Sequence, residues 1–111
     1  MSYRDTIDIY ERSEADGEPI PTYTGSPVYR SVPCTINTTK GAEFFRGRQL
    51  EANTTHVVDA RHLPGLTASM MAIARGRLEG RQLNFRAIIP VDMKNGRPQV
   101  MWIDCEEQSD Q

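Results

Sequence analysis

Hydrophobic and polar residues alternate at every second position through most of this sequence, and this pattern constrains the fold more than any other feature. Residues 7–10 read Ile-Asp-Ile-Tyr. Near the end, Met101, Ile103 and Cys105 share one parity, while Val100 and Trp102 share the other. A period of two places successive side chains on opposite faces of a strand, so the pattern predicts half-buried β-strands.

Three further segments carry the same pattern. Residues 28–36 place Val28, Val32, Cys34 and Ile36 on one parity, with Arg30 as the exception and Pro33 on the other parity. We therefore expect an edge strand or a bulged strand there. In residues 56–61, His56, Val58 and Ala60 share one face, and Val57, Asp59 and Arg61 share the other. Residues 82–91 give the clearest strand, with Leu83, Phe85, Ala87, Ile89 and Val91 on one face.

Turn signals separate these segments. Asp16-Gly17, with Pro19 and Pro21 after it, predicts a turn followed by extended chain. Residues 63–66 predict a turn before a short strand near 70–74, residues 76–80 a hairpin turn, and Asn95-Gly96 a strong hairpin signal. About six short strands with such turns are typical of a small antiparallel barrel or sandwich.

Residues 41–53 interrupt the alternation. This segment follows neither strand nor helix periodicity, and Gly47 lies in its middle. A loop of this length in a small domain is usually functional or disordered, and adjacent Phe44 and Phe45 argue against disorder. We expect a projecting loop that contains a short helical turn. Because the loop also carries Arg46 and Arg48, it is similar to a basic-aromatic surface that binds nucleic acid. The sequence is equally compatible with arginines that only keep an exposed loop soluble.

Length and charge exclude several classes. The chain has 111 residues, enough for one domain, and a formal net charge of −2. Residues 1–39 are net −3, residues 40–97 net +5 and residues 98–111 net −4, a distribution that suits a subunit meeting oppositely charged neighbours. The longest uncharged stretch, residues 62–74, is too short to span a bilayer. Cys34 and Cys105 lack metal-site spacing, so we expect two reduced, buried thiols in an intracellular compartment.

No catalytic, cofactor-binding or metal-binding pattern is present. His56 and Asp59 point to opposite faces of their predicted strand, so they cannot form a base and its orienting carboxylate. His56 is expected to be a hydrogen-bonded structural residue. Thr55 and Ser69 lack the sequence context of a nucleophile. We therefore expect that the protein is not an enzyme and needs no cofactor.

The pattern of the last predicted strand indicates a contact with another subunit or protein. Val100 and Trp102 lie on the face opposite the Met101, Ile103 and Cys105 core set. Tryptophan is enriched where proteins bind one another, so these two residues are candidates for a subunit or partner contact. The alternative is that the chain itself covers this face.

In order along the chain, these segments resemble the phage head–tail joining proteins, also called head-closure, stopper or head–tail connector proteins. The resemblance covers about residues 5–107. Its carriers are Thr6-Ile-Asp-Ile-Tyr10, Asp16-Gly-Glu-Pro19, Gly41-Ala-Glu-Phe-Phe45, Gln49, Ala52, Thr55-His56, Pro64-Gly-Leu66 and Ile103-Asp-Cys-Glu106. The sequence departs from the family in the irregular hairpin at 75–82 and in the flexible, basic loop at Gly47-Arg48.

The resemblance implies a virion protein of a tailed phage neck, assembled in the host cytoplasm. Its subunits form a ring, usually of twelve copies, that closes the DNA exit channel and presents a docking surface for the tail. The implied partners are other copies, the portal or adaptor protein of the head, tail proteins and the packaged DNA, with no membrane. The loop residues expected to contact a partner or the channel are Glu43, Phe44, Phe45, Arg46, Arg48 and Gln49.

The expected fold is all-β: a small antiparallel β-barrel, SH3-like or sandwich-like, in a single domain over residues 1–111. Residues 1–4 and 107–111 are expected to be flexible tails. Two other functions stay open at this point. One is a small β-barrel adaptor or nucleic-acid-binding module unrelated to virions, and the other is a neighbouring neck or tail-completion protein.

Overall fold

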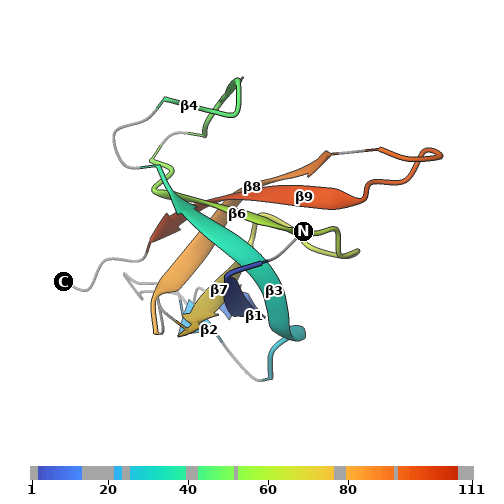
Figure 1. Ribbon diagram of the computed structural model, residues 1–111. Helices are drawn as coiled ribbons and strands as arrows, with labels where there is room; N and C mark the ends of the chain where they lie inside the picture. Colours follow the sequence, from blue (N-terminus) through green and yellow to red (C-terminus); the bar gives the residue numbers. More distant parts are fainter. Residues whose placement is uncertain are drawn as a thin grey trace.

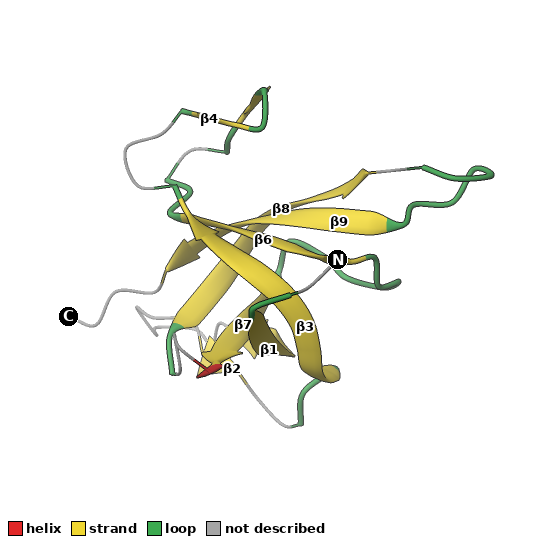
Figure 2. Ribbon diagram, viewed as in Figure 1, coloured by secondary structure: helices red, strands yellow, loops and turns green. Residues whose placement is uncertain are grey.

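The fold consists of short and medium β-strands. A computed structural model describes residues 3–13, 22–23, 26–39, 43–51, 53–76, 80–91 and 93–107. These residues contain no α-helix (Figure 1), and the short red piece in Figure 2 is the 3₁₀ position at Gly76 after β7. The strands are β1 (Asp5–Ser13), β2 (Thr22–Tyr23), β3 (Tyr29–Thr38), β4 (Phe44–Phe45), β5 (Arg48–Gln49), β6 (His56–Arg61), β7 (Met70–Arg75), β8 (Gln82–Val91) and β9 (Val100–Glu107).

Six of these strands close into an antiparallel barrel. The hydrogen-bonded order is β1-β3-β6-β9-β8-β7, and β7 pairs back with β1 over Thr6–Glu11. Short β2 adds to β1 outside this ring of strands. The expected small all-β barrel is therefore confirmed. Each of the six strands pairs on both sides over part of its length, but β8 pairs with β7 only through residues 82–84, and its residues 85–91 pair with β9 alone.

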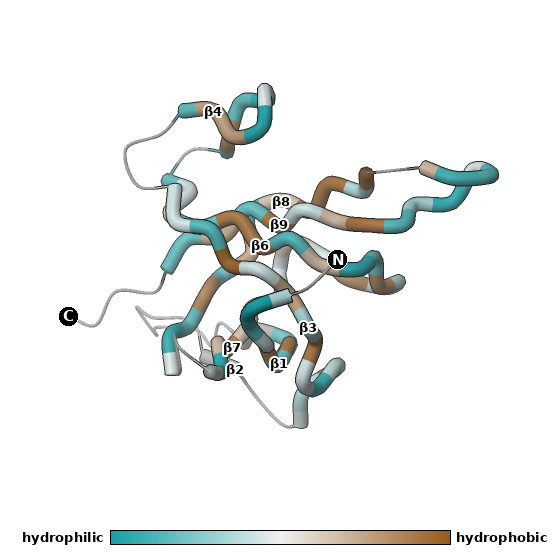
Figure 3. Tube along the Cα trace, in the orientation of Figure 1, coloured by the Kyte–Doolittle hydropathy of each residue, from teal (hydrophilic) through white to brown (hydrophobic). Residues whose placement is uncertain are grey.

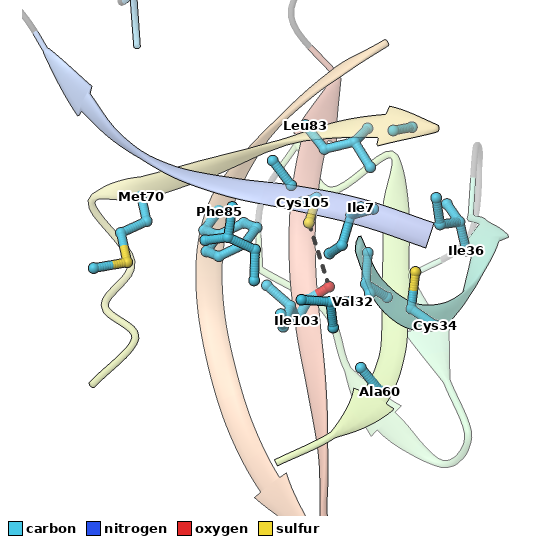
Figure 4. Close-up of a cluster of buried hydrophobic side chains, with 14 of the residues drawn as sticks. Ile7, Val32, Cys34, Ile36, Ala60, Met70, Leu83, Phe85, Ile103 and Cys105 are labelled. Carbon is cyan, nitrogen blue, oxygen red and sulfur yellow. Dashed lines mark hydrogen bonds between the residues drawn. The ribbon is translucent and has the colours of Figure 1, made fainter. Parts of the chain in front are cut away.

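Most of the side chains that were predicted to point inward fill the interior of the barrel. Figure 4 shows side chains from β1, β3, β6, β8 and β9 pointing toward one another. Cys34 and Cys105 are free, fully buried thiols within this cluster, as predicted. The buried cluster contains Ile7, Ile9, Val32, Cys34, Ile36, Val58, Ala60, Met70, Ala72, Ala74, Leu83, Phe85, Met101, Ile103 and Cys105. Hydrophilic residues gather instead at the turn between β8 and β9 (Figure 3).

A bulge in β3 explains why Arg30 breaks the parity of its strand. Between the pairs Ile7–Val32 and Ile9–Tyr29, β1 contributes one residue and β3 contributes two. Ser31 has a φ of 51°, and its N–H donates to Asp8 Oδ1 at 2.8 Å. The expected bulge is confirmed, whereas an edge position is wrong because β3 pairs with both β1 and β6.

A second bulge, in β8, corrects the predicted faces of that strand. The register changes between Phe85–Cys105 and Ala87–Asp104, so Arg86 is the extra residue. Beyond it the parity reverses: Ile88 packs against the core, while Ala87 and Ile89 lie opposite Asp104 and Trp102. The prediction that Ala87, Ile89 and Val91 share the face of Leu83 and Phe85 is therefore wrong, because one inserted residue moves every later side chain to the other face.

The predicted turns lie where expected among the described residues. Asn95 and Gly96 have φ values of 53° and 76° in the turn that joins β8 to β9, as a two-residue hairpin of this type requires. Residues 63–66 precede β7, and β7 pairs with β8 across the turn predicted at 76–80. The turn predicted at Asp16-Gly17, Pro19 and Pro21 lies outside the described residues. Of the predicted tails, 1–2 and 108–111 also lie outside them, and residue 107 belongs to β9.

Candidate functional site

The segment at 41–53 contains a hairpin rather than a helical turn. Phe44 pairs with Gln49 and Phe45 with Arg48, and the N–H of Leu50 donates to the carbonyl of Glu43 at 3.0 Å. Arg46 and Gly47 form the turn with φ values of 53° and 81°. The expected helical turn is thus wrong for the described residues 43–51 and 53 of this segment. Its physical reason is that a two-residue turn of positive φ joins two strands, β4 and β5, each too short to show alternation.

This hairpin is a sheet of its own. β4 and β5 pair only with each other among the described strands, and Figure 1 shows them standing apart from the barrel strands. Residues that pair directly across two strands share one face. Phe45 and Arg48 therefore share one face of the hairpin, and Phe44 and Gln49 share the other. No described backbone ladder attaches the hairpin to the barrel, so side chains make the connection.

Two carboxylates on the outer face of the barrel receive the hairpin. Asp59 on β6 and Asp104 on β9 have outward parity, since Ala60, Ile103 and Cys105 face the core. Their side chains are nevertheless only 9% and 1% exposed. A buried carboxylate needs a charged or hydrogen-bonding partner to offset the loss of water. Here that partner comes from β5 and from the turn of the hairpin.

Arg48 and Arg46 supply the positive charges. Both terminal nitrogens of Arg48 bind Asp104, one of them through an Nη1–Oδ2 hydrogen bond of 3.0 Å. Asp104 Oδ2 also accepts the N–H of Glu51 at 3.4 Å. Arg46 Nη2 lies 3.3 Å from Asp59 Oδ2. A two-point arginine–carboxylate contact fixes orientation as well as charge, so the Arg48–Asp104 pair sets the position of β5 over β9.

Trp102 lies between these two ion pairs. The guanidinium carbons of Arg46 and Arg48 are 5.5 Å and 5.4 Å from its ring centroid, within the range of cation–π attraction. Arg46 also lies 5.4 Å from the ring of Phe45. The hairpin therefore covers Trp102 with two cations. We call Arg46, Arg48, Asp59, Trp102 and Asp104 the arginine clasp.

The structure brings together two groups that the sequence suggested separately. The outward direction of Val100 and Trp102 is confirmed, and the chain itself covers part of this face through Arg46 and Arg48. Of the predicted loop contacts, Arg46 pairs within the chain although its side chain is 49% exposed, and Arg48 pairs there more deeply. Three others are exposed: Glu43, Phe44 and Gln49. Asp59 and Asp104 were not predicted as site residues.

A cleft opens beside the clasp. It has a volume of about 520 Å³ and lies between β5 and the outer face of β8. Leu50, Ala87 and Ile89 provide its apolar wall, and Arg48, Gln49, Glu51 and Asp104 provide its polar wall. The Nε atom of Arg48 is buried and has no hydrogen-bond partner. The cleft is thus lined by apolar side chains on one wall and by charged and amide side chains on the other.

His56 is a buried residue with a side-chain hydrogen-bond partner, as the sequence pattern predicted. It is 4% exposed, its Nδ1 lies 2.9 Å from Thr55 Oγ1, and its Nε2 lies 3.7 Å from Glu107 Oε1. Burial lowers the pKa of His56, and the neighbouring Glu107 carboxylate partly opposes this. Thr55 Oγ1 accepts the N–H of Glu107 at 2.8 Å, so this hydroxyl links the residue before β6 to the end of β9.

Within the described ranges, no group of three or more histidine, cysteine or acidic side chains is placed to hold a metal ion. No helix in the described part of the chain is long and apolar enough to cross a membrane. No family model matches this sequence, and no curated protein matches it significantly.

Proposed function

We propose that this protein is a structural component of a tailed phage neck, a head-closure or head–tail connector subunit. In this role copies form a ring below the portal and its adaptor, seal the DNA exit channel after packaging and give the tail a docking surface. The proposal rests on the ordered resemblance over residues 5–107 and places the protein in the virion, with assembly in the bacterial cytoplasm.

One structural observation carries the proposal: among the described residues, an exposed hairpin is held against a closed barrel by contacts with side chains and by no strand ladder. A ring subunit needs a rigid body that keeps its shape and a separate element that can meet a neighbour. The closed six-strand barrel has the first property. The hairpin has the second, since Phe44 is 60% exposed on it.

The geometry also sharpens the roles of the loop residues. Arg46 and Arg48 hold the hairpin against Asp59 and Asp104, so we assign them the positioning of the hairpin rather than a primary contact with a partner. Glu43, Phe44 and Gln49 are the exposed hairpin residues available to neighbours. The hairpin then acts in docking or in channel closure, and the barrel supplies the body of the ring.

The same contacts weaken the alternative of a nucleic-acid-binding module. Phosphate binding by this loop requires cationic groups that are free to meet phosphate oxygens. Both guanidinium groups of the hairpin are instead placed against carboxylates and Trp102 of the same chain. Salt-sensitive binding of DNA by the purified protein, lost in an Arg46→Ala/Arg48→Ala variant, is the result that would favour this alternative.

The decisive experiment is removal of the hairpin in the phage. Deletion of residues 43–50 should leave a folded barrel, because no barrel strand is removed and water can reach Asp59 and Asp104 once the hairpin is gone. Heads carrying this variant should lose packaged DNA or fail to join tails. Nuclease protection of head DNA and electron microscopy of the particles measure the two outcomes.

A charge-matched control is available on the other long hairpin. Deletion of residues 43–50 removes a net charge of +1, and Lys94→Ser removes the same charge from an exposed turn without touching β4 or β5. The Lys94→Ser variant should join heads to tails normally. Normal virions from the deletion variant would refute the role assigned to the hairpin, and absence of the protein from purified virions would refute the neck function itself.

A further inference from the structure

A second pocket lies on the outer side of the barrel, where the start of the chain meets β3, the end of β6 and the turn after β6. No residue of β4 or β5 lines it. We infer that this pocket binds an acidic peptide segment of a partner protein, with one apolar side chain inside it and carboxylates on Arg30 and Arg61. The inference goes beyond the proposed function and does not depend on it.

The pocket offers an apolar wall to its occupant. Its volume of about 400 Å³ is within the range of about 300–1,000 Å³ found for ligand pockets. An apolar side chain that enters the pocket removes the wall from water, which favours binding. Tyrosine and arginine, which both line the pocket, are enriched where proteins bind one another. The wall consists of Tyr3, Tyr29, Val32, Pro33 and Leu63.

The residues around the pocket are held in place before any partner binds. The hydroxyl of Tyr29 donates to the carbonyl of Pro64 at 2.7 Å. At the bulge of β3, the N–H of Ser31 donates to Asp8 Oδ1 at 2.8 Å, and Arg75 Nε donates to Asp8 Oδ2 at 3.1 Å. These bonds fix the backbone that carries Arg30. A preorganised site loses less conformational entropy when it binds.

Arg30 and Arg61 are cations that the chain itself does not pair. Both are exposed, and no described acidic side chain forms an ion pair with either of them. Asp8 lies close enough to Arg30 to feel its charge, but its two oxygens already bind Ser31 and Arg75. The two guanidinium groups at the pocket are therefore available to carboxylates of another molecule.

The separation of the two cations indicates the pattern of the occupant. The pair Cys34–Ala60 continues the β3–β6 register to Pro33 beside Arg61, and Pro33 is three residues from Arg30. Three residues of a strand span about 10 Å. Acidic side chains on both sides of one apolar residue match two cations at this separation better than one compact anion does.

A nucleic acid fits the same pocket less well. The formal net charge of −2 gives the chain no overall attraction for a polyanion. Binding to nucleic acid rests mainly on many contacts between cations and phosphates, whereas this pocket has two cations beside an apolar wall. The observations therefore favour an acidic peptide.

Selection from a random peptide library with the full chain as bait tests the inference. Enriched peptides should carry aspartate or glutamate next to phenylalanine, leucine or isoleucine. Titration calorimetry with the most enriched peptide should show binding weakened about tenfold or more by Arg30→Gln/Arg61→Gln. Tyr3→Ser, which removes part of the apolar wall, should weaken binding about threefold or more.

Two further variants separate recognition from folding. Lys94→Gln/Arg97→Gln is the control, because it removes the same charge from an exposed turn that does not line the pocket, and it should bind like the wild type. Arg30→Glu/Arg61→Glu should reject the acidic peptides and select basic peptides with the same apolar residue. Circular dichroism verifies that each variant is folded.

Three results would overturn the inference: no enrichment of peptides, enrichment of basic or uncharged peptides, or binding that Arg30→Gln/Arg61→Gln retains. A labelled single-stranded DNA oligonucleotide that binds the wild type but not this variant would assign the pocket to nucleic acid, and would also overturn it. These results leave the neck function standing, since hairpin deletion and the content of purified virions test that function. If the protein is absent from virions but acidic peptides bind as expected, the neck function fails and the pocket stands.

Discussion

Removal of the Arg48 side chain should destabilise the protein far more than loss of an ordinary surface arginine. The Asp104 side chain is 1% exposed and that of Arg48 is 21% exposed, so Arg48→Ala leaves a buried carboxylate without its cation. Breaking a buried pair from one side typically costs about 3–5 kcal/mol. Because the hairpin has no described ladder to the barrel, it can move and admit water, so we expect about 2–3 kcal/mol, below that range.

The stability lost in Arg48→Ala is a large share of the whole free energy of unfolding, which is about 5–15 kcal/mol for a chain of this size. The second step of the prediction is a rescue. Asp104→Asn removes the orphaned charge and keeps an acceptor for the N–H of Glu51. The double variant Arg48→Ala/Asp104→Asn should therefore be more stable than Arg48→Ala by about 1 kcal/mol or more.

Urea unfolding measures both steps. Trp102 is the only tryptophan in the sequence and touches Arg48, so its fluorescence reports on the clasp while circular dichroism reports on the barrel. Arg81→Ala is the control: its side chain is 50% exposed and lies 3.5 Å from Glu107, so its loss should cost about 0.5 kcal/mol or less. An Arg48→Ala variant as stable as Arg81→Ala, or a double variant less stable than Arg48→Ala, refutes the reasoning.

Two other buried groups give further predictions. Burial lowers the pKa of His56 from 6.5, so the folded state favours the neutral ring. The free energy that His56 contributes to folding is therefore fully present above about pH 6.5. It is lost as the pH falls below that value toward the lower pKa of the folded state. His56→Gln should flatten the urea-unfolding midpoint between about pH 7 and pH 5, and an unchanged slope contradicts this assignment. Burial raises the pKa of the Cys34 thiol to about 12 and raises that of Cys105 as well. Neither thiol should react with Ellman's reagent near neutral pH until denaturant is added, and rapid labelling of the folded protein would show that the core opens.

Much of the barrel could be predicted from alternation because most strands place apolar residues on the inward face, although β6 and β7 are buried on both faces. The two bulges could not be predicted in the same way. Around Arg86 both parities carry apolar residues, since Ile88 and Ile89 are adjacent, so the pattern does not show which of them faces the core. Only the β8–β9 ladder decides this, because it depends on residues far apart in the sequence.

The hairpin and the arginine clasp could not be predicted for a different reason. The turn at Arg46-Gly47 carries one of the glycines that such turns favour, but its strands are only two residues long, so alternation has no room to appear. Asp59 and Asp104 occupy outward positions where acidic residues usually contact water. The available signal was that two arginines separated by one residue match two outward carboxylates on strands predicted to lie in one sheet.

The contacts on the outer face of β6 and β9 are therefore ionic, whereas those in the core are apolar. Apolar contacts inside the barrel hold their strength as salt rises, whereas ion pairs that are partly open to solvent weaken. Of the two pairs that hold the hairpin, Arg46–Asp59 is the more open, since the Arg46 side chain is 49% exposed, whereas the Asp104 side chain is 1% exposed and its pair with Arg48 is screened much less. High salt should consequently loosen the turn at Arg46 before it affects the Arg48–Asp104 contact or the barrel. A subunit whose contact-making hairpin is energetically separable from its body can change neighbours without unfolding, which the proposed place in a ring demands.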